Sequence, residues 1–164
     1  MSSTSILLGL FLIGLLTGLR SMTPIAVLCW MTMLGRVPAV HDSMHGWMSF
    51  VANRISVAVF SLAALAELVG DKLPNTPSRT QAPGLIARIV FGALCASILA
   101  ATSEYSIIAG ILLGAFGVLA GTFAGWFVRT RAVSALRCPD LPIALLEDAI
   151  AVGGSILVCF VFAH

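Results

Sequence analysis

The chain has 164 residues, of which 59% are hydrophobic and 10% are charged, and its formal net charge at pH 7 is +2. A soluble domain usually has about 25% charged residues, so this chain has too few charges to cover a surface in water. The composition therefore predicts an integral membrane protein whose main partner is the lipid bilayer. No run of Lys and Arg interleaved with aromatic residues indicates nucleic-acid binding.

Five long apolar segments follow one another, and each is at least close to the roughly 20 residues that a helix needs to cross a bilayer. Their apolar runs are continuous rather than alternating, which argues against strands. We expect an all-α transmembrane helix bundle with about five crossings in a single domain over residues 1–164. The expected segments are 6–34, 50–70, 84–101, 107–128 and 141–162.

The first segment is too long for one straight crossing, and the sequence GLRSMTP interrupts it at residues 18–24. Pro24 removes a backbone donor and disfavours helix at the preceding residue. We therefore expect a kinked or broken first helix near Arg20. A re-entrant hairpin is the alternative for this segment.

Basic residues near the helix ends orient a bundle, because cytoplasmic loops carry an excess of Lys and Arg. In this chain they concentrate after the second and fourth segments, as Lys72, Arg79, Arg129, Arg131 and Arg137. With five crossings these two loops share one side. The prediction is a cytoplasmic N-terminus and a C-terminus outside, and a re-entrant first segment would change it.

Two pairs of short segments resemble each other and suggest an internal repeat. ILLGLF at 6–11 matches ILLGAF at 111–116, and ALAEL at 64–68 resembles ALLED at 144–148. If one helix separates two halves, the copies would be inverted, as in many transporters. Chance similarity between apolar segments is the alternative.

Four carboxylates lie within predicted helices, or directly after one, near the cytoplasmic side. Glu67 and Asp71 are four residues apart and share a helical face, while Glu147 and Asp148 lie about two turns into the last segment. A carboxylate in the bilayer costs roughly 2.5 kcal/mol or more and normally faces a cavity or a partner. We expect Glu67 to face Glu147, where the pair would bind a cation or share a proton. The alternative is ion pairing with Arg20, Lys72 or Arg129.

Arg20 lies near the middle of the first segment, beside the expected break. Broken helices expose backbone donors that hold anions, and an Arg there adds positive charge. Ser21 supplies a nearby hydroxyl as a secondary candidate. The alternative is a buried ion pair that locks the bundle.

Glycines in the fourth segment form a GxxxGxxxG stripe at Gly117, Gly121 and Gly125. This spacing lets another helix approach closely. The first segment, with Gly14 and Gly18, is the expected partner, and a second copy of the chain in a homodimer is the alternative.

The sequence predicts no metal site, no cofactor and no catalytic residue. His41 and His45 have a spacing that binds zinc on a helix, but they fall in a predicted loop without an HExxH pattern. The GxSxG elbow and the P-loop are also absent from the sequence. The four cysteines are interpreted as packing residues.

Three elements resemble the domain-of-unknown-function 4126 family of small bacterial membrane proteins. They are GLRSMTP at 18–24, ELVGDKLPNTPSR at 67–79 and LLEDAIAV at 145–152. They are similar, in the same order, to the family's AGLR-x-x-x-P, E-L-x-x-D-K-x-P and L-L-E-D elements. The resemblance implies a bacterial cytoplasmic membrane but no activity, so no catalytic residue is carried over. Its elements contain Arg20, Glu67, Asp71, Lys72 and Glu147.

These observations predict a small transporter or channel-like protein for a solute, ion or lipid. Glu67 and Glu147, with Asp71 and Asp148, would bind a proton or cation, and Arg20 would contact an anionic group or the acids. The competing interpretation is a structural or accessory membrane protein whose charges form a buried lock. A membrane enzyme acting on lipid is the third.

Overall fold

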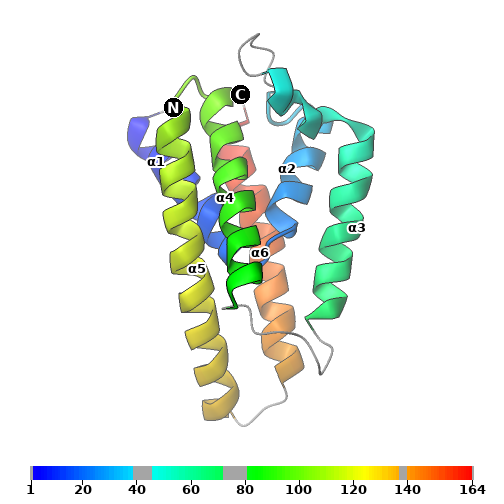
Figure 1. The fold of residues 1–164 in the computed structure, drawn as a ribbon, viewed down its shortest axis with the longest axis vertical. Coiled ribbons are helices and arrows are strands. Elements are labelled where there is room, and N and C mark those ends of the chain that lie inside the picture. The colour runs from blue at the N-terminus through cyan, green and yellow to red at the C-terminus, as the bar shows by residue number, and fades with distance from the viewer. Residues whose placement is uncertain (1, 39–45, 72–80, 137–139, 164) are drawn as a thin grey trace.

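In a computed structural model of the chain, residues 2–38, 46–71, 81–136 and 140–163 are described. These residues form six α-helices and one 3₁₀ helix, and none of them is in a strand. The expected all-α helix bundle is therefore confirmed (Figure 1). The helices are α1 (Ser3–Leu19), α2 (Thr23–Met33), η1 (Gly46–Ala52), α3 (Arg54–Gly70), α4 (Ala82–Thr102), α5 (Ile107–Leu136) and α6 (Asp140–Val161).

Three of these helices, α4, α5 and α6, are long and apolar enough to cross a membrane. The bent pair of η1 and α3, which meet at 65°, adds a fourth candidate if it is counted as one span. Helix α5 continues to Leu136, beyond its expected end at 128, because Arg129 favours helix and pairs with carboxylates of neighbouring helices. By length and composition, the described residues thus contain three or four candidate spans rather than the expected five.

The first apolar segment is broken between α1 and α2, as expected. Arg20 follows α1 with extended backbone angles, φ −138° and ψ 113°. Pro24 occupies the first turn of α2, where a missing N–H does not remove an intrahelical hydrogen bond. The break therefore lies at residues 20–22.

Helix α1 runs beside α6 in the opposite direction. A Cβ placed on Gly9 would meet the ring of Phe162, and one placed on Gly154 would meet the side chain of Leu16. The residue that follows α1, Arg20, pairs with Asp148, which lies early in α6. Helix α1 therefore starts at the end of the bundle where α6 finishes, and it stops partway along the bundle.

Helix α2 returns toward that same end beside α3. The backbone N–H of Met22 contacts Glu67, late in α3, whereas Trp30 contacts Ser61, which is earlier in α3. With 11 residues, α2 is about 17 Å long, roughly half the hydrocarbon core of a bilayer. Helices α1 and α2 thus form a hairpin that turns partway along the bundle, which is the arrangement of the re-entrant alternative that the sequence left open.

Both termini lie at the same end of the bundle (Figure 1). The expected placement of the termini on opposite sides of a membrane assumed that the first segment crosses it. Because the hairpin turns back at residues 20–22, the first segment begins and finishes at the same end of the bundle, and the following helices return the C-terminus to that end.

Helices α1 and α5 pack with their backbones in contact. A Cβ on Gly14 or Gly18 would lie less than 3.0 Å from a backbone oxygen of α5, and one on Gly117 or Gly121 would lie equally close to a backbone oxygen of α1. Thr122 of α5 donates a hydrogen bond of 3.2 Å to the carbonyl oxygen of Gly18. The glycine stripe thus contacts the hairpin within the same chain.

The two similar pairs of segments are not related by one inverted repeat. Residues 6–11 and 111–116 lie on α1 and α5, which run in the same direction, whereas 64–68 and 144–148 lie on α3 and α6, which run in opposite directions (Figure 1). An inverted repeat would require the same relation for both pairs.

Candidate functional site: an ionic cluster around the hairpin tip

The tip of the hairpin is held by a carboxylate from α3. Glu67 Oε1 accepts hydrogen bonds from Ser21 N (2.8 Å) and Ser21 Oγ (2.6 Å), and Glu67 Oε2 accepts one from Met22 N (2.8 Å). Backbone N–H groups at a helix start lack intrahelical partners and attract negative charge. Met22, the N-cap residue of α2, has no side chain that can serve this role, so Glu67 caps α2 from another helix.

Arg20 joins the tip to α6 and to the end of α3. Its side chain is fully buried; Nη1 pairs with Asp71, and Nη2 lies 2.6 Å from Asp148 Oδ1. Asp71 directly follows α3 and Asp148 lies in α6. A single guanidinium group at the break thus bridges two elements that are far apart in sequence.

Arg129, late in α5, contacts three carboxylates. Nη1 lies 3.3 Å from Asp71 Oδ2 and 3.3 Å from Glu147 Oε2, and Nε donates a 2.8 Å hydrogen bond to Asp140 Oδ1. Asp71 therefore forms ion pairs with both Arg20 and Arg129. The contacts form a continuous ionic chain from α6 through the hairpin tip and α3 to α5, and back to α6.

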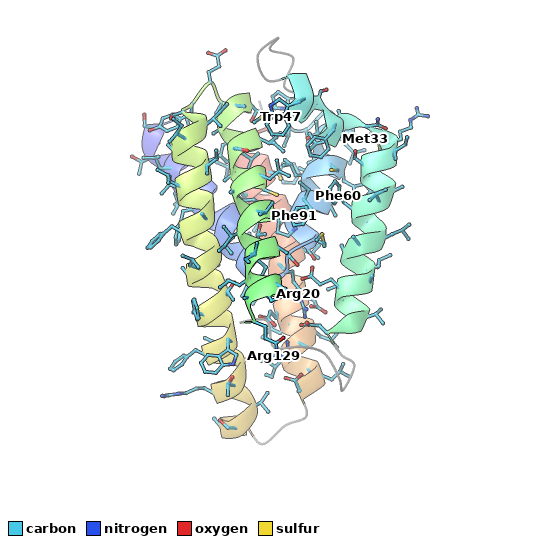
Figure 2. The ribbon with its side chains drawn as sticks, viewed as in Figure 1. Arg20, Met33, Trp47, Phe60, Phe91 and Arg129 are labelled. Carbon is cyan, nitrogen blue, oxygen red and sulfur yellow. The ribbon has the colours of Figure 1, made fainter. Side chains whose placement is uncertain are left out.

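Arg88, in the second turn of α4, completes the cluster. Its Nη2 lies 3.7 Å from Glu67 Oε1, and its side chain is buried. The ionic cluster brings together the hairpin tip and elements of all four long helices; Figure 2 shows Arg20 and Arg129 in one half of the bundle and Trp47 near the opposite end. The cluster is defined as Arg20, Glu67, Asp71, Arg88, Arg129, Asp140, Glu147 and Asp148.

Most side chains of the cluster are shielded from solvent. Their exposed fractions range from 0% for Arg20 to 17% for Arg129, while Asp140 at the rim is 53% exposed. Burying charge costs several kcal/mol per ion unless partners compensate for the lost hydration. The bundle meets this requirement with mutual pairing, so the cluster couples the positions of the helices to one another.

A cavity of about 220 Å³ reaches the cluster from the side of α5 and α6. Its wall is almost entirely apolar, and Arg129 and Glu147 are its two charged lining residues. The apolar lining residues are Leu19, Ala124, Gly125, Val128, Ile143, Leu146 and Ile150. Glu147 therefore borders a space, whereas Arg20 is fully buried by its neighbours.

A family described as a domain of unknown function, DUF4126, matches residues 6–161, nearly the whole chain. The chain belongs to this family. The match includes the turn of the hairpin at residues 20–22 and every residue of the ionic cluster. No curated protein matches the chain, and no solved structure does.

In this DUF4126 protein, the structure brings together seven polar residues that the sequence singled out. Lys72, the eighth, lies outside the described residues, as do His41 and His45. The candidate packing residue Gly125 lines the cavity. The seven polar residues in the site are Arg20, Ser21, Glu67, Asp71, Arg129, Glu147 and Asp148.

The contacts of Glu67 and Glu147 differ from the expected pairing of these two acids. Glu67 caps the hairpin tip and lies near Arg88, while Glu147 contacts Arg129 and borders the cavity. Asp71 joins Arg20 to Arg129, which is the ion pairing that the sequence left as the alternative for the acids.

Two members of the cluster were missed in the sequence, Arg88 and Asp140. Arg88 lies inside an apolar segment, so the rule that singled out Arg20 also applies to it. Asp140 lies in the first turn of α6, where an acidic side chain has a purely local explanation. Its contact with Arg129 could not be distinguished from that local role by sequence alone.

Proposed function

We propose that this protein is a small membrane transporter or channel-like protein in which the ionic cluster acts as a gate. The observation that carries the proposal is the contact between Glu67 and the hairpin tip. A re-entrant hairpin is tied to α3 by a group that can gain and lose a proton. Half-helices that begin within the membrane and point their N-termini at anionic groups are typical of transporter sites.

Protonation of Glu67, or binding of a cation to it, would weaken this contact. A neutral carboxyl group accepts hydrogen bonds less strongly than a carboxylate, and it loses its attraction to Arg88 and to the start of α2. Because a ligand shifts an equilibrium only by its differential affinity for two states, the released hairpin must be the state that prefers the proton or cation.

The orientation that we propose follows the distribution of basic residues. The end of the bundle that holds the cluster carries Arg129 and Arg131, and the adjoining parts of the sequence contain Lys72, Arg79 and Arg137. Cytoplasmic ends are enriched in Lys and Arg. We therefore assign the cluster to the cytoplasmic side of a bacterial inner membrane, with both termini outside.

Proton flux in proteoliposomes tests the gate. The probe is a pH-sensitive dye trapped in vesicles, with a potassium gradient and valinomycin as the driving force. We expect wild-type protein to conduct protons above empty vesicles, in a pH-dependent manner. Glu67→Gln mimics the protonated acid and should raise the flux about tenfold by releasing the hairpin, since a hydrogen bond to a charged group contributes about 1.5–3 kcal/mol. The same change should remove the pH dependence of the flux.

Glu104→Gln is the matched control, because Glu104 is exposed in the turn between α4 and α5, away from the cluster. It should conduct like wild type. The same vesicles are then tested with sodium and potassium gradients. Absence of proton, sodium and potassium flux for wild type would overturn the proposal of a proton or cation gate.

The second candidate function is a structural or accessory protein with a buried ionic lock, and the burial of Arg20 favours it. A fully buried guanidinium group that contacts two carboxylates fixes helix positions without any opening. In that case Glu67→Gln would lower stability while leaving vesicles as tight as those with wild-type protein.

A further inference from the structure

A groove of about 520 Å³ separates α2 from α3 in the half of the bundle away from the ionic cluster. Figure 2 shows Met33, one of its residues, near the end of the bundle where Trp47 lies. Five of the lining residues come from the first half of α3 and two from the end of α2. They are Trp30, Met33, Arg54, Val57, Ala58, Ser61 and Leu62.

The groove combines an apolar wall with one charged residue. Arg54 is exposed and is the first residue of α3. Within the groove, the indole Nε1 of Trp30 donates a 2.9 Å hydrogen bond to Ser61 Oγ, so these two polar groups satisfy each other. The lining therefore offers apolar surface over most of its length and a cation at the end of the helix.

We infer that this groove binds an anionic phospholipid, with an acyl chain along α2 and α3 and the phosphate at Arg54. In a bilayer an apolar groove between helices is filled by hydrocarbon rather than by water. A guanidinium group at a helix end reaches the headgroup region and matches the geometry of a phosphate. The apolar wall of the groove and its single cation thus agree with one occupant.

A second copy of the chain fits the groove less well. In a symmetric dimer the same surface of both copies meets at the interface, and none of the residues that line the groove is acidic. Arg54 would therefore be covered without an opposite charge from the other copy's groove, which is unfavourable for a desolvated cation. An anionic lipid instead supplies the opposite charge.

The lipid site is separate from the proposed gate. Arg54 and Glu67 lie on the same helix, 13 positions apart, which corresponds to about 20 Å along the axis. The lining residues belong to no part of the ionic cluster. Lipid binding in the groove is therefore independent of the proposed transport function.

Fluorescence quenching by brominated lipids tests the inference. The protein carries Trp47→Phe and Trp126→Phe, two exposed positions, so that Trp30 in the groove is the remaining fluorophore. It is reconstituted into vesicles with phosphatidylglycerol or phosphatidylcholine bearing the same brominated chains. Because a basic residue near an anionic surface contributes about 1 kcal/mol, the anionic lipid should reach half-maximal quenching at about a fivefold lower mole fraction.

Arg54→Gln in this background should remove the preference for the anionic lipid. Arg36→Gln is the matched control, because Arg36 is exposed after α2 and does not line the groove; it should keep the preference. Ala58→Phe fills the groove and should reduce quenching by both lipids. Equal quenching by the two lipids before any charge is changed, or a preference that survives Arg54→Gln, would overturn the inference. Quenching that falls as protein density in the vesicles rises would assign the groove to a second copy instead.

Discussion

At the scale of single residues, the site depends on which partner each charge finds. Arg20 contacts Asp71, which directly follows α3, and Asp148 of α6, and Asp71 also pairs with Arg129. The four-residue spacing correctly indicates that Glu67 and Asp71 share a helical face. Their partners, however, come from distant segments. Glu67 contacts the hairpin tip and Arg88, whereas Asp71 contacts Arg20 and Arg129.

Arg20→Gln should lower the free energy of unfolding by about 3–5 kcal/mol. The change removes one partner of a buried ion pair and leaves its carboxylates with uncompensated charge. Arg20→Lys should have a smaller effect, because a compact ammonium group keeps the charge but cannot span both carboxylates as the guanidinium fork does. Denaturant unfolding in detergent, followed by tryptophan fluorescence, measures both.

The control for this series is Arg36→Gln, at an exposed arginine outside the cluster. Exposed substitutions usually change stability by less than about 0.5 kcal/mol. If Arg20→Gln and Arg36→Gln shift the unfolding midpoint equally, the ionic cluster does not stabilise the bundle.

At the scale of helices, the hairpin depends on close packing against α5 as much as on charge. Gly18 lies against the backbone of α5, and Gly121 lies against the carbonyl of Leu15 in α1. Without a hydrophobic driving force between helices in lipid, such small residues permit the van der Waals contacts that hold helices together. The packing brings Arg20, two residues after Gly18, to the cluster.

Gly121→Ala should destabilise the protein by about 1–3 kcal/mol, because the new methyl group forces α1 and α5 apart. A Cβ at this position would lie under 3.0 Å from backbone atoms, which cannot move aside as a side chain would. The midpoint of thermal unfolding in detergent should fall accordingly.

Gly153→Ala provides the matched comparison within a helix. Nothing lies within 4 Å of a Cβ added at Gly153, and Ala favours helix over Gly. Its unfolding midpoint should equal or exceed that of wild type. A loss similar to that of Gly121→Ala would show that helix–helix distance is not the cause.

At the scale of the whole molecule, the hairpin of α1 and α2 decides at which end of the bundle each terminus lies. Helix α1 runs beside α6, the chain turns at residues 20–22, and α2 returns beside α3. Both termini lie at one end of the bundle (Figure 1). The ionic cluster collects at the level of this turn. The end of α5, with Arg131, lies at the other end of the bundle from the termini.

Cysteine labelling should place both termini on one side of the membrane. In a background without the four native cysteines, Ser3→Cys and Ala163→Cys should react with an impermeant maleimide from the same side. Ser134→Cys, exposed near the end of α5, should react from the opposite side. Labelling of the two termini from different sides would contradict the hairpin and support five crossings.

The sequence by itself determined the helical membrane class, the break beside Arg20 and the polar residues that meet in the site. These properties are local. Apolar runs indicate membrane helices, a proline indicates a break nearby, and a charge within an apolar segment indicates a buried polar site. The same local rule would have included Arg88 had it been applied to every charge within an apolar segment.

Only the tertiary structure decided the direction of the first segment and the pairing of the charges. Whether a long apolar segment crosses or turns back depends on its contacts with α3, α5 and α6, which local hydropathy does not record. Pairing depends on depth and neighbourhood in the bundle: Glu67 meets the start of α2, not Glu147, and Asp71 meets both Arg20 and Arg129. The partners of buried charges are a property of the packed bundle. A buried charge loses its hydration, so it is stable only beside an opposite charge, and the fold decides which opposite charge lies beside it.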